Sequence, residues 1–397
     1  MAHHKVIIAG GGSAGLSVAA RLLNADPSLD VAIIDPSEKH YYQPIWTLVG
    51  GGVFDRTISE RDQADFIPEG ATWIQQGVSA FDPDNNAVTL TDGSSVTYDY
   101  MVVALGIQID WDKIPGLKDT LGKPGTGVVS NYAYSTVNQT FKELESFPKG
   151  GKAIFTHPNT PIKCGGAPMK IMFLADEVFR RNGVRDDSSI TFVKGGPGIF
   201  AVKKYAQALT RVADRKGIER VWKTYLTAID GEKKEATFKH METGEETVMS
   251  YDLIHVTPPM SAPDILKNSK LGNAGGWCEV NKDTTQHVRY PNVFSLGDCS
   301  SLPTSKTGAA IRKQAPVAAE NLLAVINGDA PTQVYDGYTS CPLVTGFGKL
   351  ILAEFDYNKQ PAESFPFDQA QERYSMYALK AYALPEMYWN GMLRGRM

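Results

Sequence analysis

One short stretch near the start of the chain limits the fold more than any other feature. Val6–Ala9 is a fully apolar run, and the next six residues, Gly10–Gly15, read Gly-Gly-Gly-Ser-Ala-Gly before a helical pattern begins. A second apolar run, Val31–Ile34, ends at Asp35, about twenty residues later. A glycine-rich turn between a buried strand and a helix, with an acid closing the next strand, is typical of a dinucleotide-binding βαβ unit. The sequence therefore predicts an α/β protein with a parallel sheet.

Each part of this turn has a separate physical role. Gly10 allows the tight turn, Gly12 lets backbone N–H groups reach a pyrophosphate, and Gly15 permits close packing of helix on strand. The N-terminus of the following helix carries partial positive charge, which favours phosphate. Asp35 is placed to accept hydrogen bonds from a ribose. The residues expected to hold the dinucleotide here are Gly10, Gly12, Ser13, Ala14, Gly15 and Asp35.

Length and composition exclude several classes of protein. A chain of 397 residues suits two or three domains, and 42% apolar with 21% charged residues argues against general disorder. The 40 basic and 44 acidic residues form no block of one sign, so no nucleic-acid partner is expected. No apolar run is long enough for a transmembrane helix, and we expect no cleavable targeting sequence before the first strand. The seven histidines show no metal-ligand spacing, so no metal is expected.

Two later segments indicate which dinucleotide is bound. Tyr98–Gly106 reads as a strand that ends in a small-residue turn, and Asn292–Asp298 reads as a strand that ends in Gly-Asp. With the first glycine turn, they resemble the three signatures of flavoproteins that contain two dinucleotide-binding domains. The resemblance implies FAD, with Asp298 beside the ribityl chain and the helix after Thr307 directed at the flavin. It adds to the expected FAD contacts the residues Gln43, Val78, Gly106, Asp298, Lys306, Thr307, Gly308 and Ala309.

A second Rossmann-like domain is expected to begin near Lys152, because strand, helix and strand patterns follow one another there. An NADH-binding domain would carry its own glycine cradle between the first strand and the helix at Met169–Arg181. The chain has His157–Pro168 in that place, with three prolines and Cys164. The glycines at 195–198 come one strand too late and read as a plain turn. We therefore expect electrons to enter from something other than NADH.

The four cysteines occupy different kinds of position in the sequence. Cys164 precedes a helix, whose N-terminus would lower the thiol's pKa and favour the thiolate. Cys341 lies far away in sequence, in Ser-Cys-Pro-Leu-Val. A lone cysteine is usually a small buried residue, which is the interpretation adopted for Cys278 and Cys299.

The cysteine segments carry a closer resemblance. The loop Ile162–Lys170 and the run that begins at Cys341 resemble the two redox-cysteine motifs of sulfide:quinone oxidoreductases. The segments His40–Gly50, Ala104–Gln108 and Gly297–Thr307 also resemble that family. The match extends from residue 5 to the end of the chain, and is nearest to the subgroup that includes the animal mitochondrial enzymes.

This resemblance implies a reaction and roles for particular residues. Hydrogen sulfide would be oxidised through a Cys164–Cys341 disulfide and a persulfide, with Cys341 favoured as the persulfide carrier. Two electrons would pass through FAD to a membrane quinone, and the sulfur would remain on the protein or leave on an acceptor such as a small thiol. Pro44 and Phe347 are expected at the quinone. Other branches carry a third cysteine that residues 130–135 lack, which favours a two-cysteine mechanism.

Three other functions stay open at this point. One is an NADH:quinone oxidoreductase of the same fold, which the missing second glycine cradle disfavours. Another is the flavin subunit of a cytochrome-linked sulfide dehydrogenase, which would not need an aromatic tail. The last is a non-enzymatic sulfur carrier or sensor, which would have no use for a complete flavin site.

The tail, residues 371–397, is rich in Tyr, Trp and Met, and Pro385 is expected to divide it into two short amphipathic helices. Composition alone does not decide between helices that dock at a membrane interface and helices packed on the core or on a second subunit. A membrane quinone favours docking, so we expect peripheral attachment, on the cytoplasmic face of a bacterial inner membrane; a homo-oligomer stays open. The expected organisation is a discontinuous FAD domain at 1–110 and 270–330, a second Rossmann-like domain at 111–269, and a redox-cysteine and docking region at 331–397.

Overall fold

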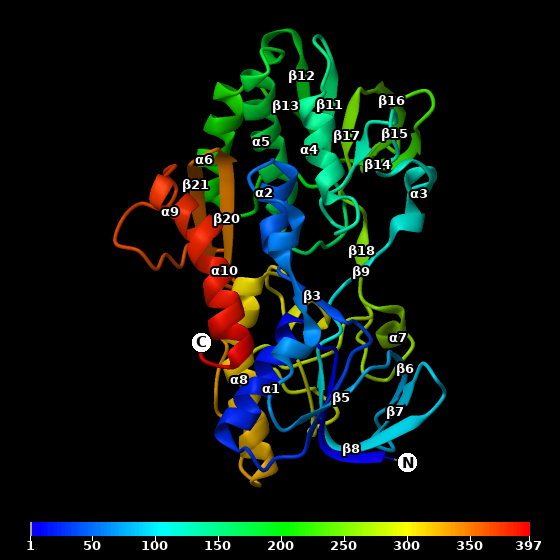
Figure 1. Cartoon of the computed structure of the whole chain (residues 1–397), viewed down its shortest axis with the longest axis vertical. Helices are drawn as coiled ribbons and strands as arrows, with labels where there is room; N and C mark the ends of the chain where they lie inside the picture. Colours follow the sequence, from blue (N-terminus) through cyan, green and yellow to red (C-terminus); the bar gives the residue numbers. More distant parts are fainter. Residues whose placement is uncertain (1) are drawn as a thin grey trace.

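The computed structural model describes residues 2–397 and shows two lobes, each built on its own sheet (Figure 1). The first lobe contains a seven-stranded sheet in the order β5-β2-β1-β8-β7-β6, with β19 beside β8. Its strands are β1 (Ala2–Ala9), β2 (Val31–Ile34), β5 (Ala71–Ile74), β6 (Val78–Asp82), β7 (Ala87–Leu90), β8 (Ser95–Val103) and β19 (Val293–Ser295).

Apolar side chains of β1 fill two cores, one on each face of this sheet. Val6 and Ile8 belong to the larger core with α1 (Ser13–Ala25) and α8 (Gly308–Ile326), whereas Ile7 packs on the opposite face. Alternation of this kind follows from the strand's two-residue period. The parallel pairing of β1 with both β2 and β8 confirms the predicted sheet.

The second lobe contains a five-stranded parallel sheet in the order β10-β17-β11-β12-β13. Its strands are β10 (Val128–Val129), β11 (Lys152–His157), β12 (Ser189–Lys194), β13 (Glu219–Trp222) and β17 (Leu253–His255). The helices of this lobe are α4 (Val137–Glu145), α5 (Ala167–Arg181) and α6 (Lys203–Arg215). An antiparallel sheet of β14 (Thr224–Asp230), β15 (Glu235–His240) and β16 (Glu246–Ser250) adjoins it. The strand, helix and strand expected after Lys152 are confirmed.

Shorter elements complete the two lobes and the passages between them. They are β3 (Lys39–Tyr41), β4 (Glu60–Asp62), β9 (Gln108–Ile109), β18 (Met260–Ser261), α2 (Trp46–Gly50), α3 (Leu117–Thr120) and α7 (Asp264–Lys267). The short 3-10 turns are η1 (Gln43–Ile45), η2 (Arg56–Ser59), η3 (Gln63–Phe66), η4 (Trp111–Lys113), η5 (Arg185–Asp187) and η6 (Gly297–Cys299). The strands β9 and β18 pair where the chain passes between the lobes.

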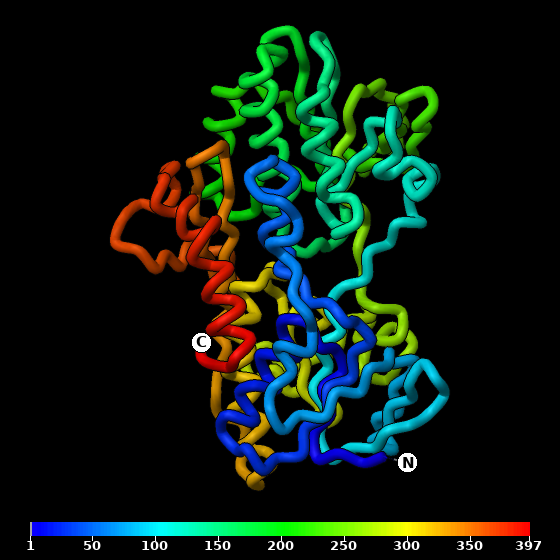
Figure 2. The backbone as a smooth tube through the Cα atoms, in the orientation of Figure 1, coloured from blue at the N-terminus to red at the C-terminus, as the bar shows by residue number. Residues whose placement is uncertain are grey.

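The hairpin of β20 (Thr339–Gly346) and β21 (Lys349–Phe355) leads to a C-terminal helical segment, residues 374–394, that returns along α1 and α8 (Figure 2). This segment comprises α9 (Tyr374–Ala378), η7 (Leu379–Ala383), α10 (Leu384–Glu386), η8 (Met387–Gly391) and η9 (Met392–Arg394). Among residues 2–397, no helix has the length and apolar character needed to cross a bilayer.

The expectation that Pro385 divides the tail into two helices is wrong. The backbone stays helical through Pro385, with a π-helical turn on each side of α10. A proline has no N–H and its ring collides with the carbonyl four residues earlier, so a wider turn at that carbonyl accommodates it. The segment is also more buried than a surface-lying helix would be, since Met376, Trp389 and Leu393 belong to the main core.

Candidate active site

A cavity of about 750 Å³ lies where the two lobes, β20 and the C-terminal helical segment meet. Its volume falls within the range typical of cofactor sites. Most of the residues predicted to bind FAD, quinone or sulfur line this cavity. They are Gly10, Gly12, Ser13, Ala14, Asp35, Gln43, Pro44, Val78, Gly106, Cys164, Asp298, Lys306, Thr307, Gly308 and Ala309.

Three predicted site residues do not line the cavity. A Cβ on Gly15 would lie 1.8 Å from the Gly10 carbonyl oxygen, so Gly15 serves the close approach of α1 to the turn. Cys341 lies behind the wall, with 1% of its surface exposed. Phe347 lies in the β20–β21 turn, where the Arg181 guanidinium stacks on its ring at 3.8 Å; the structure does not place it at a quinone site.

The glycine turn leaves open space at one end of the cavity. Gly10 adopts a φ of 107°, and a Cβ on it would collide with the Ala104 carbonyl, whereas a Cβ on Gly12 would meet nothing within 4 Å. Asp35 accepts a hydrogen bond of 2.7 Å from the Gly11 N–H. The first turn of α1 has no side-chain cap, so its N–H groups are available to an anion.

A second helix N-terminus faces the cavity, as the resemblance implied. Thr307 caps α8 by accepting a hydrogen bond from the Ala310 N–H, and leaves the earlier N–H groups free. Beside it, the Lys306 amine donates to the Asp298 carbonyl oxygen. Burial lowers the pKa of Lys306 and raises that of the Asp298 carboxyl.

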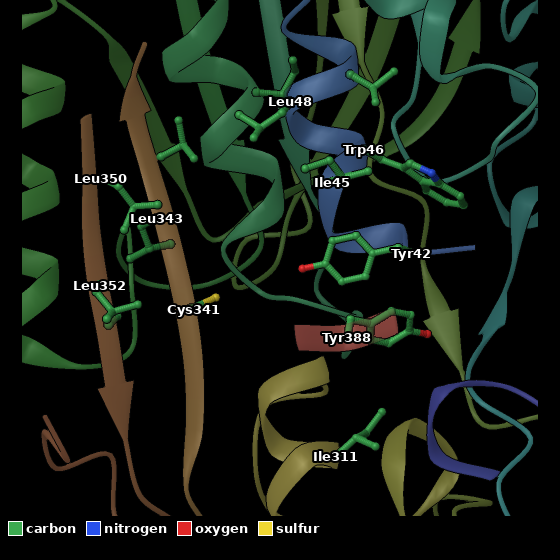
Figure 3. Packing of buried hydrophobic residues seen from close by; sticks show 14 of the residues in the cluster. Tyr42, Ile45, Trp46, Leu48, Ile311, Cys341, Leu343, Leu350, Leu352 and Tyr388 are labelled. Carbon is green, nitrogen blue, oxygen red and sulfur yellow. The ribbon is translucent and has the colours of Figure 1, made fainter. Parts of the chain in front are cut away.

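The two predicted redox cysteines come together at the cavity wall, with Cys164 lining the cavity and Cys341 directly behind it. Their sulfur atoms are 3.7 Å apart, although 177 positions separate them in the chain, and both are free thiols. Cys164 has a left-handed backbone with φ of 54°, and its N–H donates to the Lys306 carbonyl at 2.8 Å. Figure 3 shows Cys341 on β20 with its sulfur directed away from β21.

Nearby groups favour a thiolate on Cys164. The hydrogen bond from Cys341 lowers the pKa of Cys164 well below its usual range, and the positive charges of Lys170 and Lys380 act in the same direction against burial. The Lys170 amine lies 3.3 Å from the Cys164 sulfur. Conversely, the neighbouring Cys164 thiolate and burial raise the pKa of Cys341 well above its usual range. The lowered pKa agrees with the sequence expectation, but its largest causes are the partner thiol and the lysines.

Sequence reasoning missed both of these lysines. Lys170 stands in the first turn of α5 and is 3% exposed, and Lys380 comes from the C-terminal helical segment and is 2% exposed. Burial and the charge of Lys170 lower the pKa of Lys380 to about 7, and its amine donates to the Pro44 carbonyl at 2.9 Å. The spacing Cys164-x5-Lys170 could have suggested the first lysine, but nothing local in the tail indicates the second.

Uncharged polar groups on the second-lobe side of the cavity were also missed. Asn131, Tyr132 and His255 line this side, and each has a buried side-chain polar atom without a hydrogen-bond partner. Burial lowers the pKa of His255 to about 3, so its imidazole is neutral. No group of three or more potential ligands among residues 2–397 is arranged to hold a metal ion.

Comparison with known proteins places this geometry in a family. Residues 4–143 match the pyridine nucleotide-disulphide oxidoreductase family. The chain is 46% identical to mouse mitochondrial sulfide:quinone oxidoreductase over 99% of its own length and 87% of that protein's. It is 49% identical to the Dictyostelium discoideum protein of the same name, over 99% of this chain and 86% of the relative. The chain belongs to the sulfide:quinone oxidoreductase family.

The fold agrees with a solved structure of a sulfide:quinone oxidoreductase. The Aquifex aeolicus enzyme superposes with a TM-score of 0.83 over 100% of this chain and 92% of that one, at 19% identity. The family assignment confirms the α/β fold with two dinucleotide-type domains that the sequence predicted. The three relatives that are 39–49% identical to this chain are named as mitochondrial proteins, so the expected position on a bacterial inner membrane has no support.

Sulfide:quinone oxidoreductases are FAD-dependent flavoproteins, and the cavity fits that cofactor. Open space at Gly12, Gly106 and Gly308, where an added Cβ would meet nothing, leaves room for the cofactor against the backbone. Uncapped N–H groups at α1 suit the pyrophosphate, and Asp35 suits the ribose. The cavity then continues past α8 to Cys164, so a single cofactor can extend from the glycine turn to the redox cysteines.

Proposed function

We propose that this protein oxidises hydrogen sulfide and passes the electrons through FAD to a quinone. The observation that carries the proposal is the Cys164–Cys341 pair, whose sulfurs lie 3.7 Å apart at the end of a cavity that begins at a dinucleotide turn. The chain's 46% identity to the mouse enzyme supports sulfide as the substrate and quinone as the acceptor. The loop that carries Cys164 replaces the glycine cradle an NADH site would need, which disfavours the NADH-dependent alternative.

The chemistry of the cysteine pair begins from its disulfide. Sulfide attacks the Cys341 sulfur, a new S–S bond forms there as the Cys164–Cys341 bond breaks, and Cys164 leaves as the thiolate. Cys164 is the better leaving group because the Lys170 amine, 3.3 Å from its sulfur, stabilises the departing thiolate. An acceptor thiolate then removes the outer sulfur as its own persulfide and leaves Cys341 reduced. When bound, FAD supplies the two-electron oxidation that restores the disulfide and the reduction of quinone.

The charge of Lys170 stabilises the Cys164 thiolate. Lys170 donates directly to the Cys164 sulfur, and it is buried enough that its charge is poorly screened. The cysteines raise the pKa of Lys170 even though burial alone would lower it, so the amine remains charged at neutral pH. The site therefore holds an ion pair of thiolate and ammonium beside the cofactor.

Anaerobic mixing tests the proposal. When the holoenzyme is mixed with sulfide in a stopped-flow experiment, its flavin absorbance should bleach. When it is mixed with NADH, the absorbance should stay unchanged. Cys164→Ser and Cys341→Ser should abolish this bleaching. Cys278→Ser and Cys299→Ser are matched controls, because both cysteines are fully buried in the other core of the first lobe. Reduction by NADH, or undiminished reduction of Cys164→Ser by sulfide, would refute the proposed function.

We also propose that the C-terminal helical segment docks on a membrane surface without crossing it. Tyr374 and Tyr382 are 68% and 57% exposed on this segment, and aromatic rings of this kind favour the membrane interface. Leu384 and Met387 of the same segment line the cavity, which gives a quinone an apolar route from such a surface.

Deleting the segment would not test docking, because much of it belongs to the core. The double variant Tyr374→Glu and Tyr382→Glu changes only exposed positions and should no longer float with liposomes in a density gradient. Glu245→Gln, an exposed change in the second lobe, is the control. If the double variant floats like the wild type, docking is not through this face.

A further inference from the structure

A closed chain of hydrogen bonds joins the C-terminal helical segment to the dinucleotide turn. The Tyr388 hydroxyl lies 2.6 Å from Ser13 Oγ and 2.5 Å from His40 Nε2. His40 Nδ1 lies 2.9 Å from Gln63 Oε1, and Gln63 Nε2 donates to the Gly11 carbonyl at 2.7 Å. The chain therefore starts on the glycine turn at Ser13 and returns to it at Gly11.

The proton positions in this ring follow from the chemistry of its members. Gln63 Oε1 can only accept, so His40 Nδ1 carries the proton and Nε2, in a neutral imidazole, accepts. Burial lowers the pKa of His40, which keeps its imidazole uncharged. Tyr388 consequently donates to His40 and accepts from the Ser13 hydroxyl. Each of the four hydrogen bonds then has one donor and one acceptor, and all of them run in the direction set by Gln63.

Three of the four side chains in this hydrogen-bonded chain are buried, whereas Ser13 is half-buried at the cavity. Gln63 is 1% exposed, His40 5% and Tyr388 6%. The Tyr388 ring also packs on Tyr42 and on Trp389, with ring centroids 4.7 and 5.1 Å apart. Breaking a hydrogen bond of a buried group costs free energy, because the group left unpaired has no water to replace the lost partner.

Both Ser13 and Tyr388 line the cavity, at the end formed by the glycine turn. The same C-terminal helical segment carries Lys380, close enough to the redox cysteines to affect both thiols. One helical element thus contributes residues to the cavity from Lys380, near the cysteines, to Tyr388, at the glycine turn.

We propose that Tyr388 is a positioning residue for FAD, which it retains by tying the C-terminal helical segment to Ser13 and His40 and so closing the cofactor site. FAD loading and ordering of residues 374–397 are then coupled: the bound cofactor favours the closed segment, and the closed segment slows FAD loss. The proposal rests on FAD as the resident cofactor and does not depend on sulfide as its reductant.

Tyr388→Phe tests the proposal, because it removes one hydroxyl and keeps the packed ring. Loss of a buried hydrogen-bond donor should speed FAD loss into excess apoflavodoxin about tenfold or more, measured by flavin fluorescence. Tyr382→Phe, on the same segment but exposed, should leave FAD loss unchanged. Hydrogen exchange of the apoprotein should show faster exchange in residues 374–397 than in the holoenzyme.

A second variant covers the case in which Tyr388→Phe does not fold. Ser13→Ala removes the other end of the same bond at a helix start that tolerates alanine, and it should also speed FAD loss. The double variant should lose FAD no faster than the worse single variant, since both changes break one interaction. FAD loss at the wild-type rate in either folded variant would overturn the proposal, as would equal exchange of the segment in apo and holo protein. Sulfide bleaching of the FAD that these variants retain reports separately on the proposed function.

Discussion

Replacing Lys170 with methionine should remove much of the thiolate at Cys164 without opening a void. The Lys170 amine lies 3.3 Å from the Cys164 sulfur, and methionine fills similar space without charge. A hydrogen bond to a charged group is worth about 1.5–3 kcal/mol. At tenfold for each 1.4 kcal/mol, the thiolate-to-thiol ratio should fall by roughly 10- to 150-fold. The remaining hydrogen bond from Cys341 and the charge of Lys380 favour the lower part of that range.

Alkylation of the reduced protein measures this change directly. Iodoacetamide reacts with the thiolate, so its rate at Cys164, followed by peptide mass spectrometry between pH 5 and 9, traces the ionisation of that thiol. In the wild type, the rate at Cys164 should already be near its plateau at neutral pH, and in Lys170→Met the rise should shift to higher pH. Lys170→Arg should restore most of the rate. Lys203→Met, an exposed change at the start of α6, is the control. Equal alkylation profiles for Lys170→Met and wild type would refute the electrostatic argument.

Three further predictions concern the cofactor turn, a buried lysine and a buried ion-pair network. Gly12→Ala should fold normally but bind FAD more weakly, whereas Gly15→Ala should fail to accumulate as folded protein, because its Cβ would lie 1.8 Å from a backbone oxygen; circular dichroism and flavin absorbance separate the two outcomes. The pKa of Lys380 is about 7 in the folded protein against 10.5 unfolded. Between these values the unfolded chain holds the extra proton, so the free energy of unfolding rises with pH. Urea unfolding at pH 6 and 9.5 should show a smaller rise in Lys380→Met than in wild type, and Lys163 and Lys194 add to the rise in both proteins. Burial alone would raise the pKa of the fully buried Asp176 carboxyl, but Arg180, Arg185 and Lys216 lower it. Its contribution to the free energy of unfolding is therefore lost as pH falls through its pKa in the folded protein. Asp176→Asn should lower the free energy of unfolding in urea at pH 7 by about 3–5 kcal/mol, with FAD content per folded protein unchanged.

Local pattern determined much of the fold because its strands are short, apolar and separated by glycine turns. The strand before Gly10, the helix after it and the strand that ends before Asp35 form as the spacing predicts. The same is true of β11, α5 and β12 in the second lobe. The antiparallel strands β14 to β16 were not anticipated, because half-exposed strands of mixed composition give a weak periodic signal.

The tail shows where pattern reasoning fails. A proline inside a helical pattern predicts a break, yet the segment continues through Pro385 because neighbouring packing supports π-helical turns on both sides. Aromatic composition suggests an interfacial helix, yet Tyr388 and Trp389 are buried and only Tyr374 and Tyr382 present large exposed rings. Composition reports which residues are present, whereas burial depends on what lies opposite them.

By itself, the sequence determined the dinucleotide turn at Gly10–Gly15, the missing second glycine cradle, and the two cysteine segments whose family resemblance proved correct. Each of these is a short contiguous pattern whose local geometry is fixed by backbone conformation. Only the tertiary structure decided that the Cys164 and Cys341 sulfurs meet, and that Lys170 and Lys380 surround them. Only the folded chain closes Tyr388 onto the glycine turn. These contacts join residues far apart in the chain, and burial, which strengthens their electrostatic interactions, exists only once the lobes and the C-terminal helical segment have packed.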